Sequence, residues 1–169
     1  AYADVSFPVP VPKPRVHLSA REAFLYLVLF TTLYLSAYHF GSLLFDFINR
    51  AFPDPAARSY AAALGWDGMR WSVSSLIIAF PAFLFVSHHI GKAVARNPML
   101  RLSSVRRWLT YLTLFVTAAV LIGDLTTLVY SALGGELTTR IALKVAVVAL
   151  IAGTIFGYYL LDLRREERE

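Results

Sequence analysis

Four long apolar stretches dominate the chain, and short polar segments separate them. They cover residues 23–48, 70–91, 108–133 and 141–161. An α-helix rises about 1.5 Å per residue, so about 20 apolar residues cross the hydrocarbon core of a bilayer, which is about 30 Å thick. The pattern therefore predicts four membrane-spanning helices within one transmembrane domain, residues 19–161.

A capping signal predicts an additional short helix between the first two spans. Asp54 suits an N-cap, Pro55 suits the first helical position, and Gly65 is a typical helix stop. Trp66 and Trp71 follow, and tryptophan is enriched where a membrane meets water. We therefore expect this short helix to lie in the membrane interface.

The two ends of the chain differ from the apolar domain. Residues 1–18 carry proline at every second position from Pro8 to Pro14, which predicts an extended, polyproline-like arm. Ser19 and Glu22 form a capping box that begins the first helix. Residues 162–169 form a charged tail.

Composition places the chain in the membrane class and excludes several chemistries. Hydrophobic residues make up 57% of it, charged residues only 16%, and there is no cysteine. Disulfides and thiolate metal sites are therefore excluded. The sequence contains no phosphate-binding loop, dinucleotide fingerprint or hydrolase motif, so a non-enzymatic protein is predicted. We expect no nucleic-acid partner despite the net charge of +5, because the basic residues lie in short caps between apolar helices.

The basic residues also predict an orientation. Eleven of the 16 lysines and arginines lie on the side that holds both termini and the loop between the second and third spans. The positive-inside rule then places both termini in the cytoplasm. We expect that loop to bind anionic lipid headgroups through Lys92, Arg96, Arg101, Arg106 and Arg107.

The first and third spans resemble each other. At an offset of 85, LYLVLFTT (25–32) aligns with TYLTLFVT (110–117), with five identities in eight positions. A weaker alignment joins the second and fourth spans. The fold predicted from these alignments is an all-α four-helix bundle of two parallel helical-hairpin repeats, related by an axis along the membrane normal, with equivalent residues facing each other.

The same alignment pairs the two ionisable residues deepest in their helices, His39 and Asp124. A charge inside a bilayer is costly and usually has a partner. Three interpretations of His39 and Asp124 remain open. In the first, the two residues form a structural polar contact between the repeats, and in the second they form a proton relay or cation site. In the third interpretation they make no direct contact. A polar outer vestibule that adds Asp46, Lys144, Thr126 and Thr127 is also considered, against the simpler view that Lys144 extends to the interface.

His88 and His89 raise the possibility of a haem or a metal ion. Adjacent helical residues point about 100° apart, so the two histidines chelate poorly, and His39 lies toward the opposite side of the membrane. A haem would need an oligomer that brings two such histidines together. The sequence therefore predicts no metal site and no cofactor.

Three blocks resemble a known family: REAFLYLVLFTTLYLSAYHFGSLLFDFINRAFPD, RRWLTYLTLFVTAAVLIGDLTTLVYSALGGELTTR and FGYYLLDLRRE. Over residues 20–166 the chain is similar to a family of bacterial four-helix integral membrane proteins known only as a domain of unknown function. The resemblance implies a location in the bacterial cytoplasmic (inner) membrane. It assigns no functional residue.

Two functional hypotheses from different classes follow. The first is a small accessory or scaffold subunit that packs within a larger membrane assembly, with protein partners or as a homo-oligomer among membrane lipids. The second is a small oligomeric transporter or ion- or proton-conducting protein that uses His39 and Asp124. A haem-binding membrane protein ranks below both. Aromatic-rich helices with few polar faces favour the subunit.

Overall fold

The protein is all-α, as predicted. The computed structural model describes residues 20–53, 58–98 and 103–168, and these residues form four long helices. Each helix contains a stretch long and apolar enough to cross a membrane, by length and composition. In chain order the helices are α1 (Ala20–Ala51), α2 (Arg58–Arg96), α3 (Ser104–Leu133) and α4 (Thr139–Arg168).

A tight glycine turn joins α3 to α4. Gly135 has a φ of 67°, a left-handed conformation that favours glycine. The backbone amide of Glu136 then reaches the carbonyl of Ser131 at 3.0 Å, which is the six-to-one hydrogen bond of a Schellman motif. The Thr138 hydroxyl accepts a hydrogen bond from the amide of Ile141 at 3.3 Å and so caps the start of α4.

Helix α2 differs from the prediction at its start. It begins at Arg58 and continues without a break to Arg96, so Gly65 does not end a separate helix. A glycine inside a helix costs only about 1 kcal/mol relative to alanine, which the continuing backbone hydrogen bonds outweigh. The predicted short helix therefore forms the first turns of α2. Asp54 and Pro55 lie outside the described residues, and a position in the membrane interface stays a prediction.

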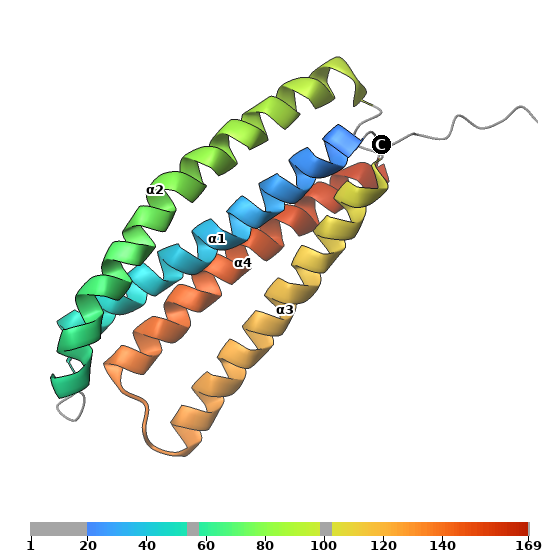
Figure 1. Cartoon of the computed structure of the whole chain (residues 1–169). Helices are drawn as coiled ribbons and strands as arrows, with labels where there is room; N and C mark the ends of the chain where they lie inside the picture. Colours follow the sequence, from blue (N-terminus) through green and yellow to red (C-terminus); the bar gives the residue numbers. More distant parts are fainter. Residues whose placement is uncertain (1–19, 54–57, 99–102, 169) are drawn as a thin grey trace, which may run out of the picture.

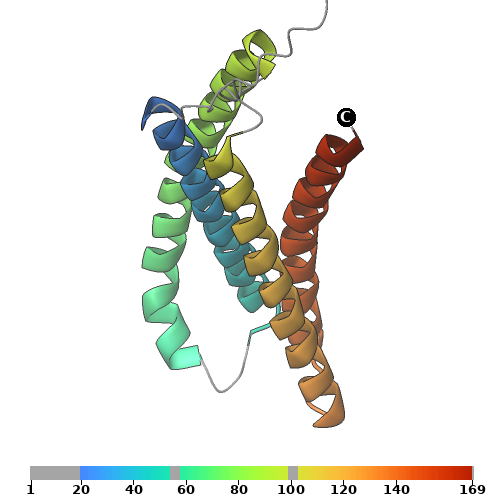
Figure 2. The same ribbon diagram turned by 90° about the vertical axis from the view of Figure 1, so that its right-hand side faces the viewer.

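The four helices pack as an open bundle (Figures 1 and 2). Helix α1 packs along α2, α3 packs along α4, and α1 also contacts both α3 and α4. In the described part of the chain, α2 makes no close backbone approach to α3 or α4. Its buried residues, Ser72, Ala79 and Val86, recur every seven residues on one narrow face.

This packing lacks the predicted two-fold arrangement. A two-fold axis relating the hairpins would make an α2–α3 contact the counterpart of the α1–α4 contact, and only the latter exists among the described residues. The aligned residues also differ in environment. Tyr26 is 4% exposed and Tyr111 is 57% exposed, while Phe30 is buried and Phe115 is exposed. The matched sequence blocks therefore do not have equivalent roles in packing.

The main apolar core lies toward one end of the bundle, where α1 and α3 begin and α2 and α4 end; we call it the basic end. Tyr26, Phe30, Leu109 and Tyr159 form its buried centre. The rings of Phe30 and Tyr159 have centroids 5.5 Å apart, within the range of favourable aromatic pairs. The core therefore holds α1, α3 and α4 together at the basic end.

Candidate functional site

A groove of about 1270 Å³ lies at the basic end, and all four helices line it. Its walls come mainly from α1, α2 and α4, and the first turns of α3 close its end. Most of the lining is aliphatic or aromatic, including Leu29, Leu33, Phe83 and Ile90. The groove exists because, among the described helices, α2 packs against α1 alone, and this leaves space between α2 and α4.

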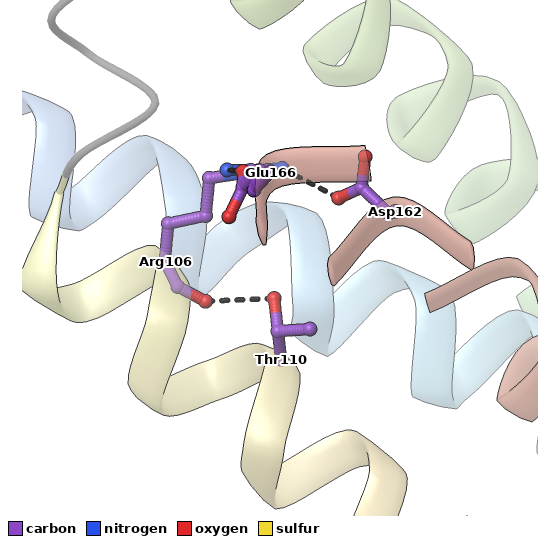
Figure 3. A network of polar contacts seen from close by, with 4 residues as sticks. All are labelled: Arg106, Thr110, Asp162 and Glu166. Carbon is purple, nitrogen blue, oxygen red and sulfur yellow. Dashed lines mark hydrogen bonds and ion pairs between the residues drawn. The ribbon is translucent and has the colours of Figure 1, made fainter. Parts of the chain in front are cut away.

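An ion cluster of Arg106, Asp162 and Glu166 lines the end of this groove, and Figure 3 shows its polar contacts. Nη2 of Arg106 on α3 lies 2.5 Å from Oδ2 of Asp162, and its Nη1 donates to Oε1 of Glu166, both on α4. The two carboxylates are four residues apart and so lie on one face of α4. The Thr110 hydroxyl donates to the backbone carbonyl of Arg106 at 2.8 Å.

The ion cluster joins the start of α3 to the end of α4, at the opposite end of this hairpin from the glycine turn. The side chains of Arg106, Asp162 and Glu166 are 16%, 34% and 17% exposed, so water screens their charges only in part. One guanidinium between two carboxylates leaves the cluster with one net negative charge. A planar guanidinium suits this geometry because it presents several donors in a fixed fork.

The sequence predicts headgroup binding by Arg106, but the structure commits this residue to the ion cluster. The partners are 56 and 60 residues away, so local sequence gave no sign of them. The available signal was the spacing of Asp162 and Glu166 at the end of an antiparallel hairpin. The exposed Lys92, Arg96 and Arg107 lie at the same end, Arg101 is outside the described residues, and lipid binding by these four stays a prediction.

His39 and Asp124, the predicted polar pair, are not joined by a hydrogen bond or an ion pair. His39 is 7% exposed, and its ring packs edge-on against Tyr38 with centroids 5.2 Å apart. Nδ1 of His39 and Oδ2 of Asp124 are both buried without a hydrogen-bond partner among the described residues. The hydroxyl of Ser36, one turn before His39, is also buried and has no partner in the part of the chain that the structure describes. The structure thus matches the alternative without direct contact.

A hydrogen bond between α1 and α3 joins residues at a different offset from that of the repeat alignment. The Tyr34 hydroxyl lies 2.6 Å from the Thr113 hydroxyl, and these two residues are 79 apart in the sequence, whereas the repeat alignment pairs residues that are 85 apart. Six residues correspond to about 9 Å along a helix axis. Since Thr113 donates its only hydroxyl hydrogen to its own helix at 2.8 Å, Tyr34 is the donor between the helices.

The residues of the predicted vestibule are brought together only in part. Nζ of Lys144 lies 5.4 Å from the centroid of the Phe45 ring, a cation–π contact between α4 and α1. Lys144 also lies within electrostatic range of Asp46. The exposed hydroxyls of Thr126 and Thr127 instead donate to carbonyls of their own helix, at 2.7 and 2.9 Å. A shared vestibule therefore stays a prediction.

His88 and His89 are exposed on α2. The His89 ring stacks on Phe85, with centroids 6.4 Å apart. No cluster of three or more potential metal-ligating side chains occurs in the part of the chain that the structure describes. The haem hypothesis stays a prediction that depends on an oligomer.

Fold and site define an all-α protein with four helices of membrane-spanning length, an open bundle and a charged groove end. A comparison with protein families matches residues 22–159 to a family described as a domain of unknown function (DUF5671), and the chain belongs to this family. This confirms the predicted membership of a family known only as a domain of unknown function, while a bacterial origin and a place in the inner membrane stay predictions. Comparisons with curated proteins and with solved structures gave no match.

Proposed function

We propose that the protein is a non-enzymatic integral membrane protein that serves as an accessory or scaffold subunit of a larger membrane assembly. In this proposal both termini lie in the cytoplasm and the membrane is the bacterial inner membrane, which the distribution of basic residues and the sequence resemblance support. The observation that carries the proposal is the one-sided packing of α2.

Helix α2 offers a wide apolar face for packing against another subunit. Apolar side chains are as stable against lipid as against protein, so helices associate in membranes through close packing and hydrogen bonds. A closed four-helix bundle would supply α2 with two neighbours, whereas α1 is the only one of the described helices that packs against it. Its exposed large side chains include Trp71, Ile77, Ile78, Phe80, Leu84 and Phe85.

Single cysteines provide a direct test, because the natural chain has none. Ile78 on α2 and Phe115 on α3 are 73% and 72% exposed, which makes Phe115→Cys a matched control for Ile78→Cys. Each variant is labelled in native membranes with a cysteine-directed photo-crosslinker, purified in mild detergent and identified by mass spectrometry. We expect Ile78→Cys to crosslink to one stoichiometric partner protein and Phe115→Cys to give much less product. An isolated monomer or homo-oligomer, with equal yields from both sites, would refute the subunit proposal.

A transporter or ion-conducting protein is the second candidate, and the buried polar atoms without partners favour it. Nδ1 of His39, the hydroxyl of Ser36 and Oδ2 of Asp124 lie inside apolar helices, where a transported proton or cation would satisfy them. In liposomes, Asp124→Asn should abolish pH-dependent flux, whereas Asp67→Asn at an exposed site should not. Unchanged flux in Asp124→Asn would exclude the relay. A Soret band in the absorption spectrum would instead support the haem hypothesis.

A further inference from the structure

The groove at the basic end is larger than an ordinary ligand site. Its volume of about 1270 Å³ exceeds the 300–1,000 Å³ that is usual for small-molecule pockets. The groove is open on one side, so in a membrane a lipid or another membrane component can enter it. The groove lies among helices of membrane-spanning length, so its occupant must suit the inside of a membrane.

The lining changes from apolar to charged along the helix axis. Leu33, Phe83 and Ile155 line its deeper part, whereas Arg106 and Glu166 line its end. An occupant must therefore be apolar over most of its length and polar at the end that faces the basic end of the bundle. A phospholipid in one leaflet has this distribution and this direction.

The length of the groove also fits one leaflet. On α4 its lining extends from Thr154 to Glu166. Twelve residues of α-helix span about 18 Å. One leaflet contributes half of the hydrocarbon core, about 15 Å, and the headgroup lies just beyond it. Acyl chains that extend from the end of α4 toward Thr154 therefore fill the groove without reaching the other leaflet.

The charges at the groove end indicate the type of headgroup. Arg106 pairs with both Asp162 and Glu166, so these three side chains together carry one formal negative charge. Arg107 lines the same groove, is exposed and supplies a positive charge. A phosphate suits the Arg107 guanidinium, and an ammonium group suits the surplus carboxylate charge.

We infer that this groove binds one zwitterionic phospholipid with a primary amine in its headgroup, a phosphatidylethanolamine, with its acyl chains between α1, α2 and α4. Arg107 holds the phosphate and the Asp162–Glu166 pair holds the ammonium group. An anionic lipid lacks the ammonium group and would meet the surplus negative charge of the ion cluster. This assignment does not depend on the proposed subunit function.

Gly91 provides a way to fill the groove without disturbing the helices. It lines the groove, and a Cβ built on it would meet no atom within 4 Å. A phenyl ring in Gly91→Phe therefore enters open space where an acyl chain would lie. Gly68 on the same helix also has open space around its Cβ but does not line the groove, so Gly68→Phe is the matched control. Ala95→Trp fills the same wall from a second position.

The test measures lipid retained by the full chain. Each protein is reconstituted with equal amounts of phosphatidylethanolamine and phosphatidylglycerol, extracted into mild detergent and examined by native mass spectrometry, with helicity checked by circular dichroism. We expect wild type and Gly68→Phe to retain one phosphatidylethanolamine, and Gly91→Phe and Ala95→Trp to retain about tenfold less. Arg107→Gln should also reduce retention.

Three results would overturn the inference. Equal retention by Gly91→Phe, Ala95→Trp and Gly68→Phe would show that the lipid lies outside the groove. Preferential retention of phosphatidylglycerol would refute the headgroup assignment. A second copy of the chain or another protein found in place of lipid, and displaced by Gly91→Phe, would identify a different occupant.

Discussion

Replacing Arg106 by methionine is expected to destabilise the protein by about 2–4 kcal/mol. Methionine keeps much of the apolar stem but removes the charge between Asp162 and Glu166. Removing one partner of a fully buried ion pair costs about 3–5 kcal/mol, and each hydrogen bond to a charged group contributes about 1.5–3 kcal/mol. Since the three side chains are 16–34% exposed, water lowers the cost below the sum of these terms. The two carboxylates, one helical turn apart, then also repel each other.

The assay is equilibrium unfolding in mixed micelles, with sodium dodecyl sulfate as the denaturant and helix content followed by circular dichroism. Arg164→Met is the control, because Arg164 is exposed on the same end of α4. An exposed charge without a defined partner should change the free energy of unfolding by no more than about 0.5 kcal/mol. The contrast between the two methionine variants isolates the contribution of the ion cluster.

A triple variant tests whether the unpaired carboxylates of Asp162 and Glu166 cause the loss of stability. Combining Arg106→Met with Asp162→Asn and Glu166→Gln removes all three charges, so no unpaired carboxylate remains. Most of the lost stability should return, because neutral side chains do not pay the cost of burying an unpaired charge. The reasoning is refuted if Arg106→Met matches wild type within about 0.5 kcal/mol, or if the triple variant is no more stable than the single one.

Two further predictions concern contacts between helices. In a double-mutant cycle of Tyr34→Phe and Thr113→Val, the hydrogen bond between α1 and α3 should give a coupling energy of about 0.6–1.7 kcal/mol in the same unfolding assay, and strict additivity would contradict it. A Cβ on Gly41 would already touch Cδ1 of Ile151 at 3.5 Å, so the further atoms of Gly41→Leu must displace Ile151 and should destabilise the protein, whereas Gly153→Leu has open space and should be nearly neutral. Equal effects at the two glycines would contradict this account.

The helices and their ends were readable in the sequence because their signals are local. The apolar stretches predicted all four helices, and the third stretch was predicted to end at Leu133, where α3 ends. Gly65 misled the prediction, since the stop signal of a glycine depends on whether the next residues continue the helix. Whether the helix continues past Gly65 depends both on the residues that follow it in the sequence and on tertiary packing.

The register between helices was not readable. The alignment of LYLVLFTT with TYLTLFVT suggested an offset of 85, but the hydrogen-bonded Tyr34 and Thr113 are 79 apart in the sequence. Membrane helices use few residue types, so similar segments recur without facing each other. The pairing of His39 with Asp124 depended on that alignment, and the two residues are not hydrogen-bonded to each other.

The sequence by itself determined the four membrane-spanning stretches and their approximate lengths, but not that α2 begins at Arg58 and includes the predicted short helix. The stretches and their lengths can be read from the hydropathy of consecutive residues, because each helix satisfies its own backbone hydrogen bonds inside a bilayer and needs no partner to form. Only the tertiary structure decided that, among the described helices, α2 packs against α1 alone and that Arg106 bridges two carboxylates of α4. The groove at the basic end was also visible only in the tertiary structure. Close packing between apolar helices depends on the shapes of both surfaces, and composition does not encode how those shapes fit.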